Sequence, residues 1–241
     1  MLETELNTLP SAEERCTHSP EEVYPQGRLE HFEPETAPQR FSPTSLIVHL
    51  VFVISGVSAL IYQLVWQRSL MLIYGSNVES VAMVVAAFMT GLGLGSLAGG
   101  AVTKRPRVPL VLLFSGAELL VGVYGIFSLR LFHWVGGYTL GAGTFETGLL
   151  AFALVFVPTL FMGATLPLLV AWRVNTTSQV GRSVSWLYFV NTLGAGLGAF
   201  LAAFVFMVKS GMSGSIRVAA LLNVVAAVVI LATWGLSRRA S

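Results

Sequence analysis

A single acidic residue stands in the middle of an apolar stretch, at Glu118 in LFSGAELLVG. No other Asp, Glu, Lys or Arg occurs between Arg107 and Arg130. A charge at the centre of a membrane helix costs about 3 kcal/mol, so such a residue pairs, is protonated or faces a wet cavity. Glu118 is therefore the first candidate for a proton- or cation-binding group. The alternative is a protonated or hydrogen-bonded side chain that only packs.

Uncharged polar residues at membrane depth form a second set of candidates. Tyr62 and Gln63 fall in the outer half of one apolar stretch, and Asn191 and Asn223 fall in two others. Such side chains form hydrogen bonds between helices that contribute roughly 1 kcal/mol each. This structural role is the favoured interpretation, and a binding site shared by Tyr62, Gln63 and Asn191 with Glu118 is the alternative.

Cofactor and metal chemistry finds little support in the residue pattern. His49 lies near the inner end of one apolar stretch and His133 just past the outer end of another, so the two cannot ligate one haem. The only cysteine, Cys16, has no companion for a disulfide or a zinc site. The glycines of GLGLGSLAGG follow no strand, so they do not form a dinucleotide fingerprint. We expect no cofactor, no metal and no catalytic residue.

The elements that position these residues follow from composition. The chain of 241 residues is 54% hydrophobic and only 11% charged, against about 25% charged in soluble domains. A bilayer core takes about 20 apolar helical residues, and the backbone must satisfy its own hydrogen bonds there. The sequence therefore predicts an all-α integral membrane protein with six transmembrane helices, at roughly 46–67, 80–102, 108–130, 149–172, 184–208 and 216–236.

The segment before these helices has a different character. Nine of the twelve glutamates lie in the first 35 residues, and six of the ten prolines lie up to Pro43. Such a segment buries too little apolar surface to offset its ordering entropy. We expect residues 1–43 to form a mostly disordered acidic tail and 44–241 to form the transmembrane domain, and a tail that folds on a soluble partner is the alternative.

Basic residues and tryptophans orient the helices. Loops rich in lysine and arginine face the cytoplasm, and one set of loops carries most of them: Lys104, Arg105, Arg107, Arg173, Arg182, Arg238 and Arg239. Both termini are therefore expected in the cytoplasm, in a bacterial inner membrane, with no nucleic-acid partner. Tryptophans near helix ends predict an interfacial belt; they are Trp66, Trp134, Trp172, Trp186 and Trp234.

Two segments of the sequence each resemble a segment about a hundred residues later. SALIYQLVWQR (58–68) is echoed by GATLPLLVAWR (163–173), and GLGLGSLAGG (91–100) by GAGLGAFLAA (194–203). Units of three helices enter the membrane from opposite sides, so the echoes predict two inverted three-helix repeats, a plan of secondary transporters. The alternative is that alanine, leucine and glycine recur in any membrane helix.

Glycines at four-residue spacing mark one face of each echoed helix. Gly91, Gly95 and Gly99 share one face, and Gly194 and Gly198 share another. Small residues at this spacing let helix backbones approach closely. The pattern predicts glycine-zipper packing, either as a sliding seam or as a static contact.

Three blocks of sequence resemble the membrane part of the fused membrane/spermidine-synthase-like proteins. They are SGVSALIYQLVWQRSLMLIYGSNVESVAMVVAAFMTGLGLGSLAGG (55–100), PTLFMGATLPLL (158–169) and GRSVSWLYFVNTLGAGLGAFLAAF (181–204). The resemblance implies helices like half of a major facilitator fold. In that family a cytoplasmic aminopropyltransferase domain follows. This chain stops at Ser241 and has no aspartate, so we expect no enzyme activity.

Two functions follow as hypotheses. The first is a non-enzymatic membrane module, resembling half of a secondary transporter, that moves or binds a small cation or polyamine as a dimer; its expected partners are the lipid bilayer and a second copy of the chain or other membrane subunits. Glu118 and the glycine seams would be its working parts. The second is an accessory or scaffold subunit of a membrane complex, whose tail docks a soluble synthase-like or redox partner.

Overall fold

The computed structural model describes residues 43–75, 78–139, 141, 143–174 and 180–239. All of them belong to one compact unit, Phe41–Ser241. The acidic tail predicted for residues 1–43 lies outside the described residues, except for Pro43.

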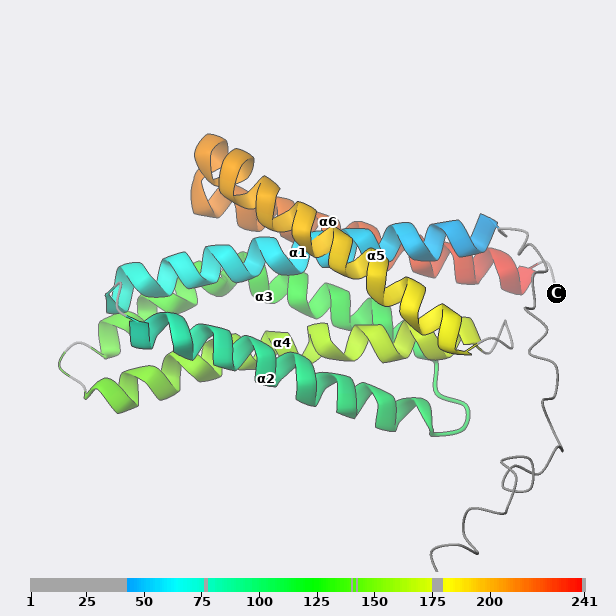
Figure 1. The fold of residues 1–241 in the computed structure, drawn as a ribbon, viewed down its shortest axis with the longest axis horizontal. Coiled ribbons are helices and arrows are strands. Elements are labelled where there is room, and N and C mark those ends of the chain that lie inside the picture. Colours follow the sequence, from blue (N-terminus) through cyan, green and yellow to red (C-terminus); the bar gives the residue numbers. More distant parts are fainter. Residues whose placement is uncertain (1–42, 76–77, 140, 142, 175–179, 240–241) are drawn as a thin grey trace, which may run out of the picture. The chain divides into compact units, whose positions relative to one another are not determined.

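Most of the described residues are helical, and none of them forms a strand. Figure 1 shows the helices labelled in chain order. They are α1 (Pro43–Tyr74), α2 (Val78–Thr103), α3 (Leu110–Tyr138), α4 (Thr144–Val174), α5 (Val180–Leu201), the π-helix η3 (Ala202–Phe206) and α6 (Met207–Arg239). The all-α fold predicted from composition is confirmed.

Five helical stretches are long and apolar enough to cross a membrane, among the described residues. They are Ser45–Tyr74, Val81–Thr103, Leu110–Tyr138, Phe145–Trp172 and Val184–Arg238. The last stretch covers both the fifth and the sixth predicted spans and is 55 residues long. Helical turns continue through η3 into α6, where the sequence predicts a loop at 209–215.

Gly211 interrupts this long stretch. Its φ of 66° and ψ of −173° are not helical, and essentially only glycine adopts that region. Figure 1 shows the chain turning back on itself where α6 begins. The turn falls inside the loop that the sequence predicts at 209–215, but only Gly211 departs from helical geometry there.

The helices extend beyond their predicted ends. α1 runs on to Tyr74 and stops at Gly75, whose φ of 93° suits a residue without a Cβ. As a result Trp66 lies two turns inside the helix and is fully buried. Its indole nitrogen donates a hydrogen bond of 2.9 Å to Ser128 Oγ. The prediction that Trp66 belongs to an interfacial belt is wrong, whereas Trp134 and Trp186 are exposed.

Each glycine face packs on a neighbouring helix. α2 lies along α4, and α5 lies along α1. A Cβ added to Gly95 would overlap the backbone of Leu160, and one added to Gly198 would overlap the backbone of Val57. The remaining predicted packing glycines are equally tight: Gly91 and Gly99 against α4, and Gly194 against α1.

A proline in α4 is matched by a hydroxyl group on α3. Pro158 lies inside α4 and has no N–H for the carbonyl four residues earlier, that of Leu154. The Tyr124 hydroxyl donates a hydrogen bond to that carbonyl. The freed backbone acceptor is thus satisfied by a neighbouring helix, as a membrane interior requires.

Candidate functional site

A cavity of about 330 Å³ lies among α1 to α5 and reaches Asn223 of α6. Much of its wall is apolar, with side chains such as Phe52, Phe88 and Met162. Its polar lining comes from Ser55, Ser58, Ser96, Glu118, Thr165, Tyr188, Asn191 and Asn223. A space of this size holds several water molecules.

Among the described residues that line the cavity, Glu118 alone is charged. α3 carries it, and its side chain is 3% exposed. Ser55 Oγ, on α1, donates a hydrogen bond of 2.7 Å to Glu118 Oε1. No Lys, Arg or His is among the described residues that line the cavity, so the lining offers the carboxylate no positive partner.

Two asparagines from the long helical stretch complete the polar lining. Asn191 lies on α5 against α1, where a Cβ added to Gly56 would stand 3.1 Å from Asn191 Oδ1. Glycine at position 56 therefore lets this amide approach α1. Asn223 lies on α6, is 1% exposed, and its Oδ1 has no hydrogen-bond partner among the described residues. A buried acceptor without a donor is costly, which makes Asn223 a strong candidate for contact with a ligand.

The structure brings Glu118 and Asn191 together but not the other two predicted residues. Tyr62 is fully buried next to Gly125 and stacks on Trp66 at 5.0 Å, away from the cavity lining. Gln63, one residue later on α1, does not line the cavity either. Tyr62 lies seven residues after Ser55, about two turns further along α1 on nearly the same face. Gln63 lies at a similar height on a different face.

Sequence reasoning missed Ser55 and did not choose Asn223 for the site. Ser55 and Ser58 lie on the first helix with Gly56 between them, and this pair of small polar residues in an apolar helix was the available signal. Asn223 carried the same signal as Asn191, an amide at membrane depth. The Asn223 side chain faces the cavity because of how α6 is rotated about its own axis. The sequence alone does not determine this rotation.

The lining supplies oxygen atoms of carboxylate, hydroxyl and amide groups. Hard cations and ammonium groups take ligands of this kind. Within the described ranges, no cluster of three His, Cys, Asp or Glu side chains could hold a metal ion. The arrangement is suited to a small cation that also contacts apolar walls.

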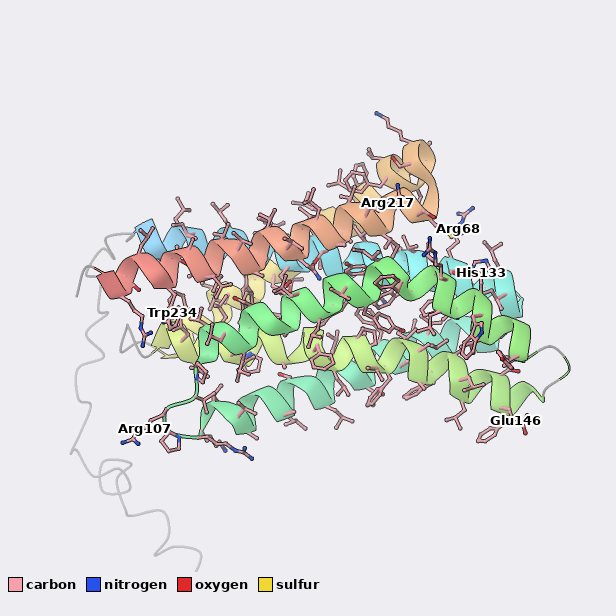
Figure 2. The ribbon with its side chains drawn as sticks, turned by 180° about the vertical axis from the view of Figure 1, so that it is seen from behind. Arg68, Arg107, His133, Glu146, Arg217 and Trp234 are labelled. Atoms are coloured by element: carbon pink, nitrogen blue, oxygen red, sulfur yellow. The ribbon has the colours of Figure 1, made fainter. Side chains whose placement is uncertain are left out.

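Figure 2 shows the ionisable side chains that it labels at the ends of the helices. Arg107 lies near one end, and Glu146 lies near the other. Glu146 is exposed in the first turn of α4, and so it contrasts with the buried Glu118. The two acids thus form a natural pair of test and control positions.

Comparison with protein-family models, with curated proteins and with solved structures finds no match to this chain. The resemblance to the spermidine-synthase-like membrane proteins stays a prediction.

Proposed function

We propose that this chain is a non-enzymatic membrane module that binds a small cation in the cavity around Glu118 and moves it as a homo-oligomer. The observation that carries the proposal is that Glu118 is buried in a cavity whose described lining has no Lys, Arg or His side chain. A carboxylate at that depth is costly unless it is neutralised. A bound cation or a proton supplies that neutralisation.

An organic ammonium ion matches this lining best. Its N–H groups would donate to Glu118 Oε1 and to the unpaired Asn223 Oδ1. Its methylene groups would lie against side chains such as Phe52 and Val121. The family resemblance points in the same direction, to a polyamine.

We further propose that the stretch Val184–Arg238 crosses the membrane twice, which gives six spans. A straight helix of 55 residues would be about 80 Å long, far beyond a bilayer core of about 30 Å. Asn191 and Asn223 would be about 48 Å apart on it, yet both line the same cavity. The non-helical Gly211 between them supplies the turn.

Several packing contacts support an inverted repeat of α1–α3 and α4–α6. α1 packs along α5 as α4 packs along α2, and α1 contacts α6 as α4 contacts α3. Exchanging the first three helices for the last three converts these two pairs of contacts into each other, although among the described residues the contact of α1 with α3 has no counterpart of similar extent between α4 and α6. The plan is that of half a major facilitator transporter, with the cavity where the halves meet. We propose the bacterial inner membrane as its location, with both termini in the cytoplasm.

Uptake into vesicles tests the proposal. The full chain is reconstituted into liposomes, and entry of radiolabelled putrescine is measured with and without a pH gradient. Glu118→Gln keeps the shape and an acceptor for Ser55 but removes the charge. It should lower uptake at least about tenfold, as expected for loss of a charge-assisted hydrogen bond of about 1.5–3 kcal/mol.

Glu146→Gln is the matched control, because Glu146 is an exposed acid outside the cavity. It should leave uptake unchanged. Equal uptake by the wild type and Glu118→Gln would refute a role for the cavity in transport.

The alternative function is an accessory or scaffold subunit. It is supported by the nine glutamates in the first 35 residues, which offer an acidic surface to a soluble partner. Deleting the tail should then abolish assembly of the complex, whereas Glu118→Gln should leave assembly intact. Native mass spectrometry of the complex from its own membrane distinguishes the two outcomes.

A further inference from the structure

A second, almost wholly apolar groove lies outside the cavity. It has a volume of about 430 Å³ and lies among α2, α3 and α4. Small residues hollow it out, including Gly95, Gly99, Gly116 and Ala164, and leucines such as Leu113 form its walls.

The groove ends at the basic loop between α2 and α3. Its lining reaches Val102 on α2, two residues before Lys104, and Leu112 on α3, five residues after Arg107. A helix rises about 1.5 Å per residue, so the apolar lining comes within one or two turns of the loop on both helices. Lys104, Arg105 and Arg107 are all exposed in this loop.

No described acid neutralises these three cations. Glu118 is buried in the cavity. Glu146 lies in the first turn of α4, beyond the far end of α3. Glu79 lies in the first turn of α2, at the opposite end of that helix from the loop. Arg107 also has a φ of 63°, a conformation that residues other than glycine seldom adopt. Among the described residues, the loop thus offers positive charge without an acidic partner, within one or two helical turns of an apolar groove.

We propose that this groove and loop form a binding site for an anionic phospholipid. One acyl chain lies in the groove, and the phosphate group is held by Lys104, Arg105 and Arg107. Basic residues between transmembrane helices on the cytoplasmic side bind anionic headgroups in this way. The site is separate from the cavity and does not rest on the proposed transport function.

Native mass spectrometry tests the site with the full chain in mild detergent. The probes are phosphatidylglycerol and phosphatidylcholine with identical acyl chains. The wild type should retain phosphatidylglycerol about tenfold or more above phosphatidylcholine. Replacing Lys104, Arg105 and Arg107 together by glutamine should remove that preference, whereas Arg217→Gln, in an exposed position on α6, should not.

Gly116→Leu tests the acyl-chain groove. An added Cβ at Gly116 meets no atom within 4 Å, so the larger side chain fills the groove without disturbing the helix packing. Retention of phosphatidylglycerol should fall about tenfold. Gly137→Leu is the matched control on the same helix, because Gly137 is equally open and lies outside the groove.

Three results would overturn the proposal. The first is equal retention of the two lipids by the wild type. The second is displacement of the phosphatidylglycerol by inorganic phosphate, which would make the loop a site for free phosphate. The third is loss of a dimer in Gly116→Leu with lipid retention unchanged, which would make the groove a contact with a second copy.

Discussion

Because α1 and α5 pack closely at Gly198, we predict how much a side chain at this position lowers the free energy of unfolding. A Cβ at this position would stand 2.7 Å from Val57 Cα and 2.9 Å from its carbonyl carbon. Ordinary carbon contacts lie at about 3.5–4.0 Å, so the helices would have to separate by about 1 Å. Both atoms belong to the backbone, which cannot move aside as a side chain can.

Gly198→Ala should therefore destabilise the protein. Overpacking of this kind costs about 1–3 kcal/mol, partly offset by up to about 1 kcal/mol because alanine favours a helix more than glycine does. Gly196→Ala is the matched control, because an added Cβ there meets no atom within 4 Å. It gains the helix preference without the clash. The two variants should differ by about 1–3 kcal/mol in unfolding free energy, with Gly198→Ala the less stable.

Denaturation in mixed micelles, followed by tryptophan fluorescence, measures this difference. Both variants carry the same chemical change in the same helix, two residues apart. Effects of detergent and of the unfolded state therefore cancel between them. Equal stability of Gly198→Ala and Gly196→Ala would refute the close α1–α5 contact and the packing role assigned to the glycine face.

Three further predictions concern single hydrogen-bonding groups. Ser55→Ala removes the donor to Glu118 Oε1 and should weaken putrescine binding about tenfold. Equilibrium binding measures the affinity, and an unchanged affinity would contradict the site geometry. Asn223→Leu removes an unpaired buried acceptor. It should therefore keep or raise the melting temperature while weakening putrescine binding. A lowered melting temperature with normal binding would contradict the role of Asn223 in the cavity. Tyr124→Phe leaves the Leu154 carbonyl unsatisfied and should cost about 1–2 kcal/mol in the same denaturation assay. Tyr138→Phe, at a 74% exposed position, serves as its control and should cost nothing measurable.

The sequence predicts the helices well because lipid imposes a simple rule on composition. A run of apolar residues between charges must be helical, and five of the described helical stretches are long and apolar enough to cross a membrane. The ends are predicted less well, because helices continue past the apolar segment, as α1 does to Tyr74. The turn at Gly211 was not predicted as a single-residue break, because helix continues on both sides of it.

A site residue can be predicted from the sequence when burying its side chain in the membrane costs so much free energy that the residue is rare there. Glu118 stands out because a buried charge is expensive, and it does line the cavity. Tyr62 and Gln63 are polar too, but a tyrosine or an amide carries no charge and can face any neighbouring helix. Ser55 was missed because serine is common in helix interfaces. Which face of a helix meets a cavity depends on helix rotation, and this is set by packing contacts far apart in the sequence.

Direct binding of a cation to the cavity tests the central claim most closely. Putrescine is titrated into the full chain in detergent by calorimetry, for the wild type, Glu118→Gln and Glu146→Gln. The cavity around Glu118 predicts saturable binding to the wild type and to Glu146→Gln, and none to Glu118→Gln. Saturable binding that survives in Glu118→Gln, or its absence from the wild type, would contradict the claim.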